Sequence, residues 1–262
     1  MSIASTDIVI YGAANIAEND SNTQGGAIDT TIRYIFDDAD LVNDPTTDGG
    51  DGTLIYVSDN AGDNMNITVT GRDISGSIVS ETKAINNTTP VAGTQVFERI
   101  LKIVLASAAS GSITVSDSLS NTLLTIEAGV TTVRRPFYNA SSDLSSEKNY
   151  YEKVFVRNNH ATLSLLGATF IESSDPTTNL EFALEDAVND NSSVANRLTA
   201  PAAGDLGSSG FSSDTKYLTE IDAGTADLAA GSAIGIFLKL NLPAAEPATK
   251  SYYTIQISGS SI

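Results

Sequence analysis

Residues 66–117 decide the fold, and they read NITVTGRDISGSIVSETKAINNTTPVAGTQVFERILKIVLASAASGSITVSD. Short runs rich in Ile and Val alternate here with turn residues, as in Asn-Asn-Thr-Thr-Pro at 86–90. β-Branched runs separated by turns about every 8–12 residues are typical of an antiparallel sandwich or barrel. We therefore expect 68–70 and 78–82 to pair as a hairpin. We expect 96–106 to be a further strand because it is rich in β-formers, although its apolar spacing also fits a helix.

The same alternation of polar and apolar residues continues on both sides of this stretch, and it predicts strands there. These strands are expected at residues 7–11, 30–37, 53–58, 122–126, 131–137, 150–157, 162–172, 180–185, 217–221, 233–242 and 252–258. Residues 187–214 differ, since Asn, Ser, Ala and Gly replace the alternating pattern. We expect a surface loop there, and a loop of this length is commonly functional or mobile.

The expected fold class is all-β, with two antiparallel β-sandwich domains of immunoglobulin-like or jelly-roll-like type. Residues 31–138 form the first sandwich in this interpretation, and 149–262 form a second, immunoglobulin-like one. The polar segment NASSDLSSEK at 139–148 is expected to be the linker between them. Residues 1–30 are polar and contain glycines between two short strand-like runs, which predicts an extended N-terminal arm.

The composition excludes several kinds of partner and chemistry. At pH 7 the 262-residue chain carries a formal net charge of −18, because 32 Asp and Glu residues outnumber 14 Lys and Arg residues. Such a surface repels nucleic acid phosphates and anionic lipids, so neither is expected as a direct partner. Cysteine is absent, which excludes disulfides and thiolate nucleophiles and fits assembly in a reducing cytosol. The start of the chain does not resemble a secretory signal, and no run is long enough for a membrane helix.

Catalytic motifs are not expected. His160 is the sole histidine and stands in Asn-Asn-His-Ala, which indicates a hairpin turn, and no Gly-x-Ser-x-Gly motif supplies a nucleophile for it. Glycoside hydrolysis needs two facing carboxylates, and sugar sites usually stack aromatic side chains on the ring. Trp is absent and aromatic residues make up 6% of the chain. The sequence therefore predicts a protein that is not an enzyme.

Clusters of acidic residues are the candidates for metal binding. They are Asp38, Asp40, Asp44, Asp48 and Asp51, the run Asp-Asn-Ala-Gly-Asp-Asn at 59–64, and the group Glu185, Asp186 and Asp190. Carboxylates suit calcium, but none of these clusters has the spacing of an EF-hand loop. Because Asp and Asn also form turns, we expect no cofactor and keep a structural calcium ion as the alternative.

A candidate interface is defined by the locally basic and aromatic run Arg134, Arg135, Pro136, Phe137 and Tyr138. Arg and Tyr are favoured at interface hot spots, so this run is either an interface anchor or a strand end that packs the two halves together. The same candidate interface includes apolar residues of the expected arm, namely Tyr11, Ile16 and Ile28.

Three runs of the chain resemble virion structural proteins of tailed bacteriophages. They are IVIYGAANIAENDSNTQGGAIDTTIRYIF, then ITVTGRDISGSIVSETKAINNTTPVAGTQVFERILKIVLA, and then RRPFYNASSD before YYEKVFVRNNHATLSLLGATF. The resemblance spans about residues 7–172 and is greatest to a head decoration (cement) protein. It implies a homo-oligomer, with a trimer favoured over a dimer, that is assembled in the host cytoplasm. Such a protein binds the outer capsid surface and bridges major capsid protein subunits, and its arm would add a strand to a neighbour.

Three other functions are kept as alternatives. Within the virion, the chain could be a tail tube, baseplate or fibre-attachment protein, which are also built from β-sandwiches. Outside it, the alternatives are a carbohydrate-binding or adhesion module and a β-rich hydrolase acting on surface polysaccharide. A trimer seen in the density of the capsid shell would favour decoration. Retention on glycan columns would favour the binding module, and sugar release that one carboxylate substitution abolishes would favour the hydrolase.

Overall fold

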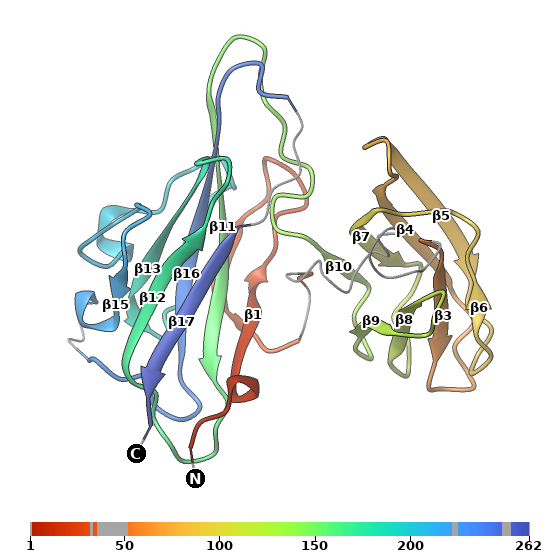
Figure 1. Cartoon of the computed structure of the whole chain (residues 1–262), viewed down its shortest axis with the longest axis horizontal. Coiled ribbons are helices and arrows are strands. Elements are labelled where there is room, and N and C mark those ends of the chain that lie inside the picture. The colour runs from red at the N-terminus through yellow and green to blue at the C-terminus, as the bar shows by residue number, and fades with distance from the viewer. Residues whose placement is uncertain (1, 32–33, 36–51, 222–224, 248–252, 262) are drawn as a thin grey trace. The chain divides into compact units, whose positions relative to one another are not determined.

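The computed structural model describes residues 2–31, 34–35, 52–221, 225–247 and 253–261, and it is all-β with several antiparallel sheets (Figure 1). The chain forms two compact units. Unit 1 consists of Met1–Thr30 together with Asn139–Ile262, and unit 2 consists of Thr31–Tyr138. Unit 2 is therefore an insertion, in the sequence, between two segments that fold together.

Unit 2 contains two four-stranded antiparallel sheets, in the orders β10-β7-β4-β5 and β6-β3-β8-β9. Its strands are β3 (Leu54–Ser58), β4 (Asn66–Arg72), β5 (Ile78–Ala84), β6 (Val91–Ala92), β7 (Arg99–Leu105), β8 (Ile113–Asp117), β9 (Thr122–Ile126) and β10 (Thr132–Arg134). The expected hairpin is confirmed, since β4 and β5 pair in register. The segment with ambiguous spacing forms strand β7, as expected.

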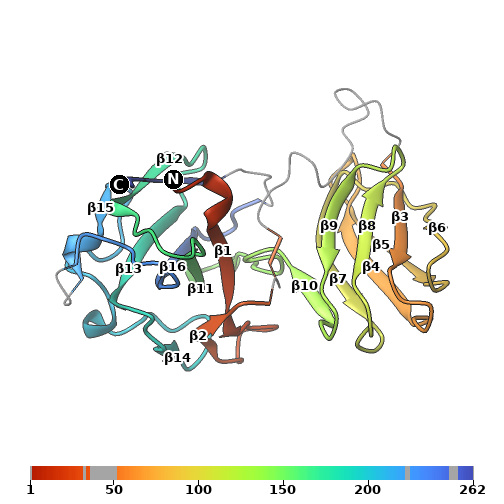
Figure 2. The same cartoon turned by 90° about the horizontal axis from the view of Figure 1, so that it is seen from below.

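The two sheets of unit 2 share one apolar core because their strands alternate. On β4, Ile67 and Val69 are buried, while Thr68 faces outward and lies with its hydroxyl 2.9 Å from that of Thr82 on β5. The core cluster draws residues from both sheets, so the sheets pack face to face (Figure 2). Its fully buried members include Tyr56, Ile67, Val69, Ile100, Ile103, Ile113 and Val115.

Unit 1 contains a six-stranded sheet in the order β13-β16-β11-β1-β2-β14 and a three-stranded sheet in the order β15-β12-β17. Its strands are β1 (Ile8–Asn15), β2 (Gln24–Asp29), β11 (Lys148–Asn158), β12 (Leu166–Ser174), β13 (Leu180–Val188), β14 (Ser193–Val194), β15 (Lys216–Tyr217), β16 (Ala233–Leu242) and β17 (Thr254–Ser260). The longest pairing joins β11 to β16. The described residues of the unit also form short 3-10 helices at Ser5–Asp7, Ala203–Asp205 and Leu218–Glu220.

The N-terminal segment is not an extended arm, so that prediction is wrong. Strand β1 pairs with β11 on one side and with β2 on the other, and β2 also pairs with β14. The sequence did not indicate this pairing because the buried residues of β2 have no large apolar side chains. Gly25 and Gly26 lie in its buried half with φ of +100° and +90°, a conformation that favours glycine.

Three other expectations need correction or fall outside the described residues. Residues 139–148 belong to unit 1 and are no linker between consecutive domains. The strand expected at 217–221 is mostly the 3-10 helix Leu218–Glu220. Much of the strand expected at 30–37, and the acidic residues Asp38, Asp40, Asp44, Asp48 and Asp51, lie outside the described residues. In the described part of the chain, no helix is long and apolar enough to cross a membrane.

Candidate functional site

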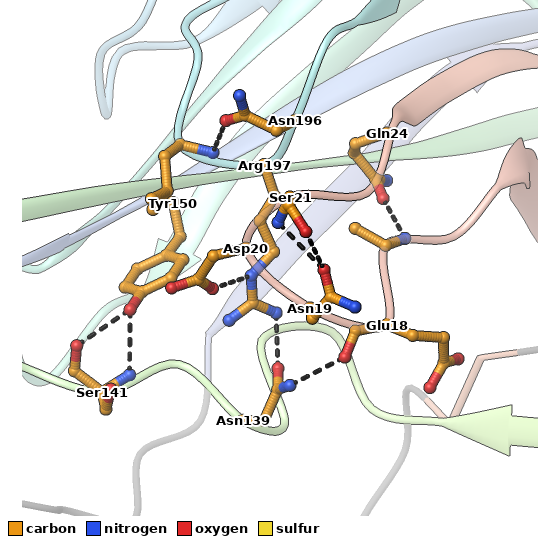
Figure 3. A network of polar contacts seen from close by, with 12 residues as sticks. Glu18, Asn19, Asp20, Ser21, Gln24, Asn139, Ser141, Tyr150, Asn196 and Arg197 are labelled. Carbon is orange, nitrogen blue, oxygen red and sulfur yellow. Dashed lines mark hydrogen bonds and ion pairs between the residues drawn. The ribbon is translucent and has the colours of Figure 1, made fainter.

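A network of polar contacts in unit 1 surrounds Arg197, whose charged side chain is completely buried (Figure 3). Its Nε donates to Asp20 Oδ1 at 3.0 Å, and its Nη1 donates to Asn139 Oδ1 at 2.5 Å. Glu152 Oε1 lies 3.7 Å from Nη1, and the ring centroid of Tyr150 lies 4.6 Å from Cζ. A buried guanidinium needs such partners, because desolvation of an unpaired charge is very costly.

This network joins three segments that are far apart in the sequence. Asp20 lies in the loop between β1 and β2, Asn139 lies where the chain re-enters unit 1, and Arg197 follows β14. Asn139 also donates to the backbone oxygen of Glu18 at 3.0 Å. The Tyr150 hydroxyl donates to the Ser141 carbonyl at 2.9 Å. Arg197 thereby fixes both the β1–β2 loop and the re-entry point of the chain.

A hollow of about 540 Å³ lies beside this network and is lined by Asn19, Asp20, Ser21 and Asn139. Most of its polar atoms already have partners within the protein. Asn19 Oδ1 accepts from the backbone and hydroxyl groups of Ser21, and Asn139 uses both its oxygen and its nitrogen. The hollow therefore presents amide groups that are largely hydrogen-bonded within the protein, together with the carboxylate of Asp20.

The basic and aromatic run proposed as an interface anchor is largely internal. Arg134 and Arg135 are buried, and Arg134 lies over the rings of Tyr34 and Tyr138 at 5.2 Å and 5.4 Å. Arg135 Nε donates to the carbonyl of Ile100 at 2.5 Å. The two arginines hold the last strand of unit 2 in place, so they cannot be interface anchors at a partner's surface.

The aromatic residues of the same run are more accessible. Phe137 and Tyr138 are half-buried, and Phe137 has a φ of +56°. Lys102 donates to the Tyr138 hydroxyl at 3.3 Å and also lies over its ring at 5.2 Å. Lys102 therefore adds a second cation to the cluster formed by Arg134 and Tyr138, a cluster that sequence reasoning had only half identified.

The candidate interface residues of the N-terminal segment lie in unit 1. Tyr11 and Ile28 are half-buried and pack against the buried cluster of Ala13, Phe155 and Ala233. The Tyr11 hydroxyl also accepts a hydrogen bond from Asn159 at 2.8 Å. Ile16 is half-buried in the loop after β1. The structure brings Tyr11 and Ile28 together as part of the sheet, which gives them a packing role.

His160 lies in the loop after β11, and this loop is not the predicted hairpin turn, because β11 pairs with β1 and β16 while β12 belongs to the other sheet of unit 1. Its Nδ1 accepts hydrogen bonds from the backbone amides of Thr162, at 3.1 Å, and Leu163, at 2.9 Å. Its own amide donates to Asn158 Oδ1 at 3.0 Å. The imidazole is half-buried and organises this loop.

Asp63 in the predicted acidic turn at 59–64 organises neighbouring loops. Its carboxylate accepts from the amides of Ser110 and Gly111 at 2.8 Å and 3.0 Å and from the Ser58 hydroxyl at 2.7 Å. These hydrogen bonds, that from Ser110 above all, lower the pKa of Asp63. Among the described residues, no group of three or more His, Cys, Asp or Glu side chains is placed to hold a metal ion.

Sequence reasoning missed a buried cluster around Lys153 on β11 and Glu185 on β13. The two side chains form an ion pair and are both inaccessible to solvent. Lys153 Nζ also donates to the carbonyls of Gly26 and Ser192, each at 3.0 Å. The Ser192 hydroxyl donates to Glu185 Oε1 at 2.7 Å, while Glu185 Oε2 has no hydrogen-bond donor. Lys153 stands in an alternating strand, where its sequence gives no sign of burial.

Comparisons with known proteins add no family. No protein family model matches the chain, and no curated protein matches it. Among solved structures, the crystal structure of the infectious bursal disease virus VP2 subviral particle aligns with a TM-score of 0.14 and 10% sequence identity. The alignment covers 97% of this chain and 70% of the viral chain. A similarity at this level shows neither a shared fold nor a shared function.

Proposed function

We propose that this protein is a non-enzymatic structural protein of a tailed-bacteriophage virion that decorates the outside of the head. In this role it binds the major capsid protein as a homo-oligomer, with a trimer favoured, and stabilises neighbouring subunits. The resemblance of residues 7–172 to such proteins supports the proposal, as does the all-β fold. The two units would be separate β-sandwich domains of the immunoglobulin-like or jelly-roll-like kind.

The structural observation that carries the proposal is an edge of unit 2 that has no further strand beside it among the described residues. Strand β5 is at the end of its sheet and is hydrogen-bonded to β4 on one side. Apolar side chains are exposed at its start, since Ile74 in the preceding turn is 74% exposed and Ile78, the first residue of β5, is 58% exposed. An open edge strand beside exposed isoleucines can bind a partner by main-chain pairing and apolar contact together.

The net charge of −18 is consistent with this role. A strongly acidic surface keeps a protein that is made in many copies from associating with itself at random, and it directs binding toward basic patches. Electrostatic attraction of this kind sets the rate and the specificity of docking more than its affinity.

The proposal is tested on capsids of the phage that encodes this chain, assembled without it. Light scattering gives the oligomeric state, and co-sedimentation gives binding to the shells. A trimer or dimer that binds the shells and raises their melting temperature supports decoration, because binding to the assembled shell alone stabilises it. A hexameric ring that does not co-sediment with the shells supports a tail protein instead. Retention on glycans without shell binding supports an adhesion module.

A further inference from the structure

The buried cluster around Lys153 and Glu185 has the composition of a reactive site. An amine and a carboxyl group meet in the interior of unit 1. The two residues come from β11 and β13, which are not neighbours, because β16 lies between them in the sheet. A direct link between these side chains would therefore join β11 to β13 across the intervening strand β16.

Strand β16 leaves room for this meeting at Gly235. A Cβ atom at position 235 would collide with the carboxyl group of Glu185. Gly235 pairs with Phe155 on β11, and the next residue on the same face, Phe237, pairs with Lys153. Glycine inside a buried strand is unfavourable unless another group needs the space. Here the carboxyl group of Glu185 uses that space to reach Lys153.

The surroundings of Lys153 Nζ are apolar on one side and rich in acceptors on the other. The nitrogen lies 4.7 Å from the ring centroid of Phe155 and 5.5 Å from that of Phe237. Carbonyls of Gly26 and Ser192 accept from it. Because water is excluded from this position, condensation of the two groups is not opposed by bulk solvent.

Asp190 supplies a second carboxyl group. Its own carboxylate accepts from the Ser192 amide at 2.6 Å, and the Ser192 hydroxyl donates to Glu185 Oε1 at 2.7 Å, so both carboxyl groups are hydrogen-bonded to Ser192. Asp190 is half-buried, so it can exchange protons with solvent. Burial opposes the charged form of Asp190, but its hydrogen bonds from Ser192 outweigh burial and lower the pKa of Asp190, so this carboxylate can accept a proton.

Burial also brings both reacting groups toward their neutral forms. It raises the pKa of Glu185 to about 8, against the attraction of Lys153. Burial likewise lowers the pKa of Lys153, against the attraction of Glu185. A neutral amine is the nucleophilic form of lysine, and a protonated carboxyl is the electrophilic form of glutamate.

We propose that Lys153 and Glu185 condense spontaneously in the folded protein to form an isopeptide bond between β11 and β13. The Nζ lone pair attacks Cδ of Glu185, and the new C–N bond forms as the carbonyl becomes tetrahedral. Asp190 takes a proton from the nitrogen and gives it to the departing hydroxyl group. The C–O bond breaks, one water molecule leaves, and an amide remains, so no oxidant or other reactant is needed.

The product fits the same hydrogen-bond partners. The amide N–H can donate to Gly26 or Ser192, which already accept from Nζ, and the amide oxygen can accept from the Ser192 hydroxyl. Two buried charges are replaced by one neutral group, which removes their desolvation cost. Two free molecules would lose translational and rotational entropy when they react. The folded sheet already holds the two groups together, so this cost does not arise in the condensation.

The test is the intact mass of the purified full chain after unfolding. The mass should be lower than the mass of the sequence by one water molecule. Protease digestion should give one pair of linked peptides, containing Lys153 and Glu185. A folded chain of full mass would overturn the proposal, and so would a loss of water without that linked pair.

Variants identify the roles of the individual groups. Lys153→Met should have its full mass, and Glu185→Gln should lose ammonia instead of water and give the same linked product. Asp190→Asn should fold but lose the water molecule slowly or not at all. Loss of water at the wild-type rate would overturn the role of Asp190 in proton transfer. Lys239→Met is the matched control, because Lys239 on β16 pairs with Glu181 on β13 at 2.8 Å but both are partly exposed. This control should still lose water.

Discussion

Glu185 lies across Gly235, so that its carboxyl group fills the space where a side chain at position 235 would be. Replacement of this glycine by alanine should displace the carboxyl group from Lys153, so that the two side chains can neither pair nor condense. Together with the steric clash, this should lower the free energy of unfolding of unit 1 by about 3 kcal/mol. Denaturant titration followed by hydrogen exchange of β11 peptides measures the change.

The matched control for Gly235→Ala is Gly204→Ala. A Cβ atom at position 204 meets nothing within 4 Å, and its φ is not positive. This control should change the free energy of unfolding by less than about 0.5 kcal/mol. Equal effects of the two substitutions would show that Gly235 is not needed for the Lys153–Glu185 contact.

Arg197 should be essential for the stability of unit 1. In Arg197→Ala, Glu152 stays buried and loses this positive charge, while Asp20 and Asn139 lose their common donor. Removal of one member of a buried charged network costs about 3–5 kcal/mol. Asp20→Asn should cost much less, because the side chain of Asp20 is 44% exposed. Thermal unfolding of the two variants beside the wild type measures the difference, and equal melting temperatures would contradict it.

The sequence predicted which face of a strand is buried better than it predicted which strands pair with each other. Ile67 and Val69 identify a buried face because their neighbours are threonines, and that pattern is local. The pairing of β1 with β11 is a long-range contact that spans the whole of unit 2 in the sequence. No period within either strand encodes such a pairing, so the N-terminal segment was interpreted as an arm.

The buried charges were missed for a related reason. Lys153 and Arg197 are normally surface residues, and only their partners in space, Glu185, Asp20 and Glu152, make their burial possible. One signal was present in the sequence, since Gly235 interrupts the apolar run AIGIFLKLNL. A glycine in the interior of a buried strand indicates that another group approaches closely.

Asp63 should make the loops of unit 2 sensitive to acid. Its pKa is lowered from 3.8 in the folded state, so its stabilising contribution is complete above that value and is lost as the pH falls through the lower folded pKa. Exchange of the Ser110 and Gly111 amides should therefore be faster in Asp63→Asn than in the wild type at neutral pH. The difference should shrink as the pH falls below about 4.

Asp73→Asn is the control for this pH dependence. The pKa of Asp73 is also lowered, chiefly by its hydrogen bond with Ser75, but it lies in the exposed β4–β5 turn. Its replacement should leave exchange at Ser110 and Gly111 unchanged at every pH. A difference between Asp63→Asn and the wild type that persists undiminished in acid would contradict the assigned cause.

The exposed isoleucines of unit 2 should matter for binding and not for folding. Replacement of both Ile74 and Ile78 by serine should weaken co-sedimentation with capsid shells at least tenfold, which corresponds to about 1.4 kcal/mol. The melting temperature of the free protein should stay the same, since neither side chain is buried. Leu119→Ser is the control, because Leu119 is 53% exposed in a different turn of unit 2. Equal binding by all three proteins would exclude the β5 edge as the docking surface.

Deletion of residues 1–26 distinguishes a free arm from an integral part of the sheet. The deletion removes β1 and half of β2, so β11 loses the partner on one side and Lys153 loses the carbonyl of Gly26. Hydrogen exchange should show β11 and β16 unprotected, while β4 and β7 in unit 2 stay protected because they have their own core. A chain that kept full protection in unit 1 without these residues would restore the arm interpretation, since an arm contributes to assembly and not to the fold of its own chain.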